Sequence, residues 1–191
     1  GVSAARAYHL VVGITYSAGP ALLYWMARGL GAARGAGIAA ALAVSLFSPS
    51  ALLMPGFGVD TGSALHARRL QAMVVYGEGP HVSGMVLAAL AILAFERAAE
   101  RGGARSFALA ALAIAPVLLT NTPASVALVL AVFCWLLARP GGWMTAAGAG
   151  LLAYGLCAFA IPPSTIARTS YNVRNAPGGF AFSSQKLLVG L

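Results

Sequence analysis

The chain has 191 residues, of which 60% are hydrophobic and only 8% are charged, and its net charge is +8. Soluble domains contain about 25% charged residues, so this composition excludes an ordinary water-soluble globule and predicts a protein embedded in a membrane. The basic residues lie between apolar segments, which indicates contact with membrane lipids or anionic substrates and no role for nucleic acid as a partner.

Both ends of the sequence indicate that it is part of a longer protein. It begins at Gly1 rather than Met, and it ends at Leu191 inside a new apolar run, 187–191. The apolar stretch after Arg6 is about 20 residues long, which is too long for the apolar region of a signal peptide. We therefore expect one transmembrane domain over residues 1–191, taken from the middle of a larger membrane protein.

The apolar segments predict an all-α fold, a polytopic transmembrane bundle of six spans and the start of a seventh. A bilayer core about 30 Å thick needs about 20 mostly apolar residues for each crossing. The sequence Thr-Asn-Thr-Pro at 120–123 divides the longest segment, because Asn or Thr before Pro is typical of a helix start. The expected spans are Tyr8–Met26, Gly35–Leu53, His81–Phe95, Ser106–Leu119, Pro123–Leu137 and Met144–Ile161.

Six crossings place the connecting loops on two faces of the membrane. One face has the short loops 27–34, 96–105 and 138–143, and the other has the long loops 55–80 and 162–186. The 12 Lys and Arg residues divide equally between the faces, so the positive-inside rule sets no orientation. Long loops in compact proteins are often functional, and we expect the long loops to be extracytoplasmic in a bacterial inner membrane.

The loop before the third span has the largest set of polar side chains. Glu78 and His81 are candidate catalytic residues, with Asp60 as a third. A carboxylate and an imidazole at the membrane boundary can bind a divalent cation or transfer protons. The alternative is structural, with Glu78 favouring a helix N-terminus and Asp60 lying in an ordinary turn.

Residues 65–76 in the same loop are expected to form a short interfacial helix that lies flat on the membrane. Leu70 and Val74 are expected to face the hydrocarbon, and Arg68 and Arg69 the headgroups. Two adjacent arginines can hold a phosphate or pyrophosphate by bidentate hydrogen bonds. The alternative is that they anchor the helix among lipid headgroups.

Further polar residues on the same face are candidates for binding an anionic, hydroxyl-rich ligand. They are Arg168, Tyr171 and Arg174 in the loop 162–186 and Asn121 between two spans. For the loop residues the alternative is a solvated loop, and for Asn121 it is a helix cap.

Two other groups of residues are interpreted as structural. Glu96, Arg97, Glu100 and Arg101 are expected to form a solvated helix end with pairs four residues apart. The segments Gly35–Ala40 and Gly148–Ala153 imitate a dinucleotide fingerprint, but neither follows a strand, so we assign both to helix packing.

Several short motifs together resemble one family. They are Ala5–Leu10, Ser17–Leu22, Tyr24–Arg28, Arg69–Gln71, Tyr76–His81, Leu119–Pro123 and Pro162–Ala167. These motifs resemble bacterial GT-C-like multi-span membrane proteins, which are related to lipid-phosphate-sugar-dependent glycosyltransferases. Some members are labelled as membrane proteins related to 6-pyruvoyl-tetrahydropterin synthase.

The resemblance implies an outward-facing site and a polyprenyl-phosphate-linked sugar donor. The four arginines named above would hold the donor phosphate, and Glu78 and His81 would line the acceptor or metal site. A key acidic residue of these enzymes lies in a first outer loop that is absent from this sequence. Two alternatives stay open: a non-catalytic membrane scaffold, and a transporter or flippase. A transporter is expected to have ionisable residues inside its spans, where we count none.

Overall fold

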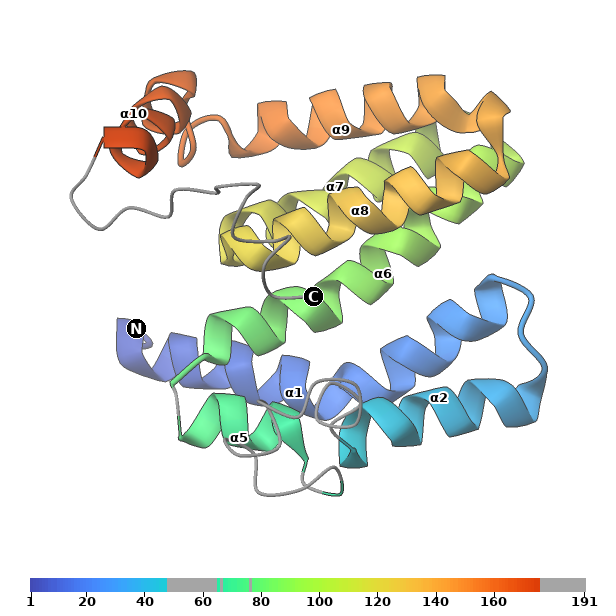
Figure 1. Ribbon diagram of the computed structural model, residues 1–191, viewed down its shortest axis with the longest axis horizontal. Coiled ribbons are helices and arrows are strands. Elements are labelled where there is room, and N and C mark those ends of the chain that lie inside the picture. The colour runs from blue at the N-terminus through green and yellow to red at the C-terminus, as the bar shows by residue number, and fades with distance from the viewer. Residues whose placement is uncertain (48–64, 66, 76, 176–191) are drawn as a thin grey trace, which may run out of the picture. The chain divides into compact units, whose positions relative to one another are not determined.

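The structure is a computed structural model that describes residues 1–47, 65, 67–75 and 77–175 (Figure 1). All regular elements in these ranges are helices, which confirms the expected all-α class. They are α1 (Ala4–Gly29), α2 (Arg34–Leu46), α5 (Arg68–Val74), α6 (Gly79–Arg101), α7 (Ala104–Thr120), α8 (Thr122–Ala138), the short 3-10 helix η1 (Pro140–Gly142), α9 (Trp143–Cys157) and α10 (Pro163–Asn175). The chain divides into two compact units, 1–156 and 157–191.

Helix boundaries follow local signals in the sequence. The Asn121 side chain accepts a hydrogen bond from the Ala124 N–H at 3.3 Å and caps α8, so the predicted division at 120–123 is confirmed. Between α6 and α7 the chain turns at Gly102 and Gly103, whose φ angles are 62° and 80°. Only glycine adopts such positive φ values readily, so this turn depends on the glycine pair.

Three element boundaries differ from the sequence predictions. Helix α6 continues to Arg101 through residues assigned to a loop, because Ala, Glu and Arg are strong helix formers. Helix α2 ends at Leu46 rather than at Leu53, since Phe47 has an extended backbone, and residues 48–53 lie outside the described residues. The segment expected to be a loop at 162–186 contains α10, which begins with Pro163 at a position that proline favours.

Helix α6 is central to the first unit and contacts α1, α5, α7 and α8. The core around α6 is built mainly from alanine, and only a few of its buried side chains are larger. Its buried members are Ala88, Ala91, Ala98, Ala110, Ala111, Ile114, Val117, Ala124, Leu128, Ala149 and Ala153. Small side chains let helix backbones approach closely, which is the packing mode of membrane helices.

Glycines set the closest approaches between helices. Gly84 of α6 lies against α8, where a Cβ at position 84 would be 2.6 Å from the Cβ of Ala124. Gly37 lies against Tyr24, and Gly148 lies against Phe107, so the glycine-rich segments assigned to helix packing do pack helices. The dinucleotide interpretation was correctly set aside for both segments.

Contacts between α1 and α6 show in which direction α1 runs relative to α6. Near its start, Gly79 lies against Tyr8 and Val12 of α1, and Ser83 hydrogen-bonds Thr15 at 2.7 Å. Near its end, Leu93 lies against Gly29. Because residue numbers rise in the same direction along both helices through these contacts, α1 runs parallel to α6.

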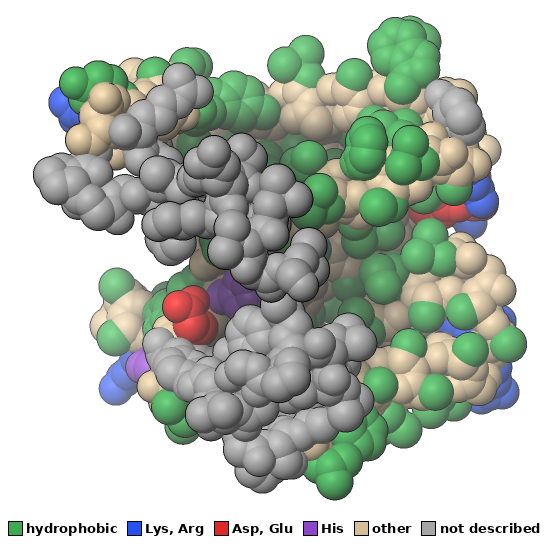
Figure 2. Space-filling view, in the orientation of Figure 1, with side chains coloured by type: hydrophobic (Ala, Val, Ile, Leu, Met, Phe, Trp, Pro, Cys, Tyr) green, Lys and Arg blue, Asp and Glu red, His purple; other side chains and the backbone are tan. Residues whose placement is uncertain are grey.

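By length and composition, two helices of the described ranges, α1 and α6, are long and apolar enough to cross a membrane. The other four expected spans coincide with the shorter apolar helices α2, α7, α8 and α9, of 13, 17, 17 and 15 residues. Figure 2 shows charged side chains at the right edge of the view, where α6 and α8 end, and hydrophobic side chains along the helices.

Replacing Gly84 by Ala is expected to destabilise the protein, because the new Cβ would overlap the Cβ of Ala124, which is fixed to the α8 backbone. We expect a loss of about 1–3 kcal/mol in the free energy of unfolding, measured by denaturation of the protein in detergent micelles. Gly13→Ala in α1 is the matched control, since that position has open space around it. The control should be neutral or stabilising, because Ala favours helix over Gly by about 1 kcal/mol. Equal effects at the two positions would contradict the packing interpretation.

Candidate functional site

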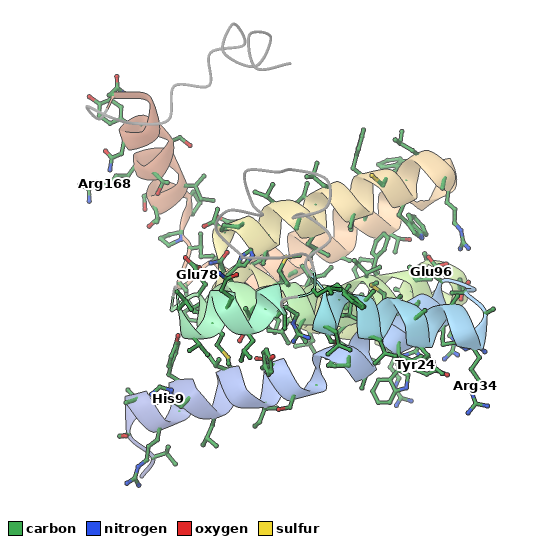
Figure 3. The ribbon with its side chains drawn as sticks, turned by 60° about the horizontal axis from the view of Figure 1, so that its bottom comes forward. His9, Tyr24, Arg34, Glu78, Glu96 and Arg168 are labelled. Carbon is green, nitrogen blue, oxygen red and sulfur yellow. The ribbon has the colours of Figure 1, made fainter. Side chains whose placement is uncertain are left out.

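Polar side chains of the first unit gather at three places: the contact between α1 and α5, the start of α6 and the end of α6. Figure 3 shows Glu78 and Glu96 at opposite ends of α6.

Arg69 of α5 contacts the middle of α1. Its Nη2 donates a hydrogen bond to the backbone oxygen of Tyr16 at 2.9 Å, and its guanidinium carbon lies 4.8 Å from the centre of the Tyr16 ring. Leu70 and Val74 of the same helix are 45% and 67% exposed, as side chains expected to face hydrocarbon should be, whereas the Arg69 guanidinium lies against α1. Burial lowers the pKa of Arg69, and the nearby Tyr16 opposes this shift.

Glu78 lies at the N-cap position of α6 and is exposed, but its side chain makes no capping hydrogen bond. His81 lies in the first turn of α6 and is half-buried. Asp60, the third predicted catalytic residue, lies outside the described residues. In the part of the chain that the structure describes, no three His, Cys, Asp or Glu side chains are grouped to hold a metal ion.

The predicted phosphate-binding residues are distributed over several elements. Arg68 precedes Arg69 on α5, and Arg174 lies on α10; the side chains of both are outside the described set. Arg168 and Tyr171 are exposed on α10, in the second unit. Asn121 caps α8, so its structural alternative is confirmed. Arg69 and Glu78 are brought to neighbouring helices, because α5 packs on α6.

At the end of α6, Glu96 is only 2% exposed, and α8 supplies its partners. Trp135 Nε1 donates a hydrogen bond to one carboxylate oxygen, and Arg139 Nη1 lies 2.7 Å from the other. Arg139 also approaches Glu100 at 3.8 Å. The ring of Phe95 meets that of Trp135 edge to face, with centroids 4.8 Å apart. The buried Glu96 carboxylate, with one partner on each oxygen, therefore joins α6 to the end of α8.

The solvated helix end predicted at Glu96 is therefore wrong. Residues four apart there are of like charge, Glu96 with Glu100 and Arg97 with Arg101, so they do not form attractive pairs. The true partners lie on another helix, 39 residues away for Trp135. A sequence signal did exist: Arg139 follows Trp135 by four residues, so the end of α8 offers an indole N–H and a guanidinium close together.

No family model, no curated protein and no solved structure matches this chain. The resemblance to GT-C-like proteins therefore rests on the short motifs of the sequence.

Replacing Arg139 by Met is expected to destabilise the protein, because the buried Glu96 carboxylate would keep only the Trp135 hydrogen bond. We expect a loss of about 1–3 kcal/mol in the free energy of unfolding, measured by denaturation in detergent micelles. Arg97→Met is the control, since Arg97 is an exposed cation on α6 next to Glu96 and makes no ion pair with a described residue. If both variants unfold alike, the ion pair at Glu96 contributes nothing specific.

Proposed function

We propose that this chain is an integral membrane domain in which α1, α2, α6, α7, α8 and α9 form about six crossings. The observation that supports this is the exposure of apolar side chains: only 11% of the apolar window of α1 is buried. Helix α8 likewise exposes Val129, Leu130, Phe133 and Leu137. In water such a surface would associate with other surfaces, whereas hydrocarbon solvates it.

The membrane proposal is tested by fractionation of bacterial cells that produce the chain. We expect it in the inner-membrane fraction, and we expect it to resist extraction by alkaline carbonate, because apolar helices are retained by the hydrocarbon. A Ser164→Cys variant at the start of α10 should react with a membrane-impermeant maleimide in intact spheroplasts if the loop 162–186 is extracytoplasmic. A monodisperse protein in detergent-free buffer would refute the membrane proposal, and labelling only after lysis would reverse the orientation.

We propose further that the domain belongs to a GT-C-like transferase that takes a sugar from a polyprenyl-phosphate donor. Support comes from the motifs and from two neighbouring helices at one end of the unit, where α5 carries Arg68 and Arg69 and α6 begins with Glu78 and His81. Preorganised cations would stabilise the phosphate as the bond between it and the sugar breaks. The exposed Glu78 carboxylate would deprotonate the acceptor, or hold a divalent cation together with His81.

One observation favours a transporter or flippase as the second candidate. The predicted spans contain no ionisable group at mid-depth, but the Arg69 guanidinium contacts Tyr16, near the middle of α1. If α1 crosses the membrane, this guanidinium lies well inside it. Ionisable groups at such depth are typical of substrate paths.

Glu78→Gln in the intact protein distinguishes the two candidates. For a transferase we expect glycan transfer from a polyprenyl-phosphate sugar to fall by about 10²-fold or more, because the amide cannot accept the proton. Glu100→Gln, at the other end of the same helix, is the control and should keep its turnover. Unchanged turnover in Glu78→Gln would remove Glu78 from the mechanism, and uptake of substrate into proteoliposomes without a covalent product would identify a transporter.

A further inference from the structure

Pro20 leaves a gap in the hydrogen bonding of α1. In an α-helix the N–H of each residue bonds the carbonyl oxygen four residues earlier, but proline has no N–H. Pro20 lies inside α1, so the carbonyl oxygen of Tyr16 has no helical N–H from that position. An unsatisfied carbonyl in an apolar environment costs free energy, and proteins supply another donor.

Arg69 supplies this donor from α5. Its Nη2 atom lies 2.9 Å from the oxygen of Tyr16, the same oxygen that Pro20 cannot bond. Residue 19 is glycine, and any Cβ there would overlap the Arg69 guanidinium. The guanidinium also covers the Tyr16 ring. Pro20, Gly19 and Tyr16 thus form a site on α1 that fits one planar cation.

The two parts of α1 on either side of this site are attached at different points. The part before Gly19 is held to the start of α6 through the Thr15–Ser83 hydrogen bond and the contact of Val12 with Gly79. The part after Pro20 packs through Tyr24 on Gly37 of α2 and through Gly29 on Leu93 of α6. A proline inside a helix permits bending at its position. The middle of α1 is therefore a position at which the helix can bend between its two points of attachment.

We propose that Arg69 is a latch for a hinge in α1 at Pro20. The guanidinium replaces the missing N–H and fixes the angle between the two parts of α1. Arginine suits this task because its planar fork can donate to the carbonyl while it covers an aromatic ring, which an ammonium group cannot do in the same way. The latch depends on neither proposed activity and would operate in a transferase or in a transporter.

The latch couples α5 to α1. Anything that draws the guanidinium away, including an anionic group that competes for it, breaks the hydrogen bond to Tyr16 and frees the hinge. By linkage, the hinge position then changes the affinity for that anion. Since α5 is followed directly by α6 in the described part of the chain, movement at Arg69 also reaches the segment that carries Glu78.

A double-mutant cycle tests the latch. Arg69→Met removes the donor, and Pro20→Ala restores the N–H that bonds Tyr16. In the protein with Pro20 we expect Arg69→Met to lower the Tm in detergent by about 5 °C. In the Pro20→Ala background, where the carbonyl is already bonded, we expect the same change to lower the Tm by only about 1–2 °C. Equal losses in both backgrounds would overturn the proposal.

A distance measurement supplies a readout that a purely stabilising contact would not move. Spin labels at Leu10→Cys, an exposed position in the first part of α1, and at Cys134 of α8, in a Cys157→Ala protein, report the first part of α1 against α8. We expect a wider distance distribution for Arg69→Met and a distribution like that of the parent for Arg69→Met with Pro20→Ala. An unchanged distribution in Arg69→Met would refute the hinge. If Arg69→Met alone does not fold, folding restored by Pro20→Ala supports the latch. If neither Arg69→Met nor the double variant folds, Arg69→Lys replaces Arg69→Met in the cycle. A smaller loss of Tm in the Pro20→Ala background then supports the latch, and equal losses in both backgrounds overturn it.

Discussion

Close approach of helix backbones at small residues is the constraint on which the first unit depends. Between helices in hydrocarbon there is no hydrophobic driving force, so association rests on van der Waals contact and a few hydrogen bonds. Gly84 against Ala124 brings α6 to α8, and Gly79 against Val12 brings α6 to α1. An alanine-rich core gives α6 neighbours on several sides at once.

Polar contacts between the helices lie at different positions along α6. Thr15 bonds Ser83 near the start of α6, and Arg139 with Trp135 bonds Glu96 near its end. Moving a charged side chain out of water costs roughly several kcal/mol in free energy. Only well-placed charged and hydrogen-bonding partners offset this cost. At Glu96 a cation and an indole N–H meet separate carboxylate oxygens. These contacts specify which end of α8 meets which end of α6. Contacts between alanines alone would define this orientation less well.

Much of the helical organisation could be predicted from the sequence, because apolar segments and caps are local signals. The division at Asn121 and the packing role of Gly37 and Gly148 are examples. Two features could not be predicted in this way. Glu96 has its partners on another helix, and the facing of Arg69 depends on a carbonyl 53 residues away that is free only because of Pro20. Periodicity within one segment carries no information about either partner.

The contact of Arg69 with α1 bears on both proposed activities through the same atoms. A guanidinium has five N–H donors, and the bond to Tyr16 uses one of them. Because the Arg69 side chain is already held in place, less of its conformational entropy is lost when an anionic ligand binds. A fixed Arg69 would therefore increase the affinity for a phosphate group. A ligand that instead needs the donor bonded to Tyr16 must open the hinge at Pro20. A transferase benefits from the first case and a transporter from the second, so the mobility of α1 during turnover is the property that separates the two functions.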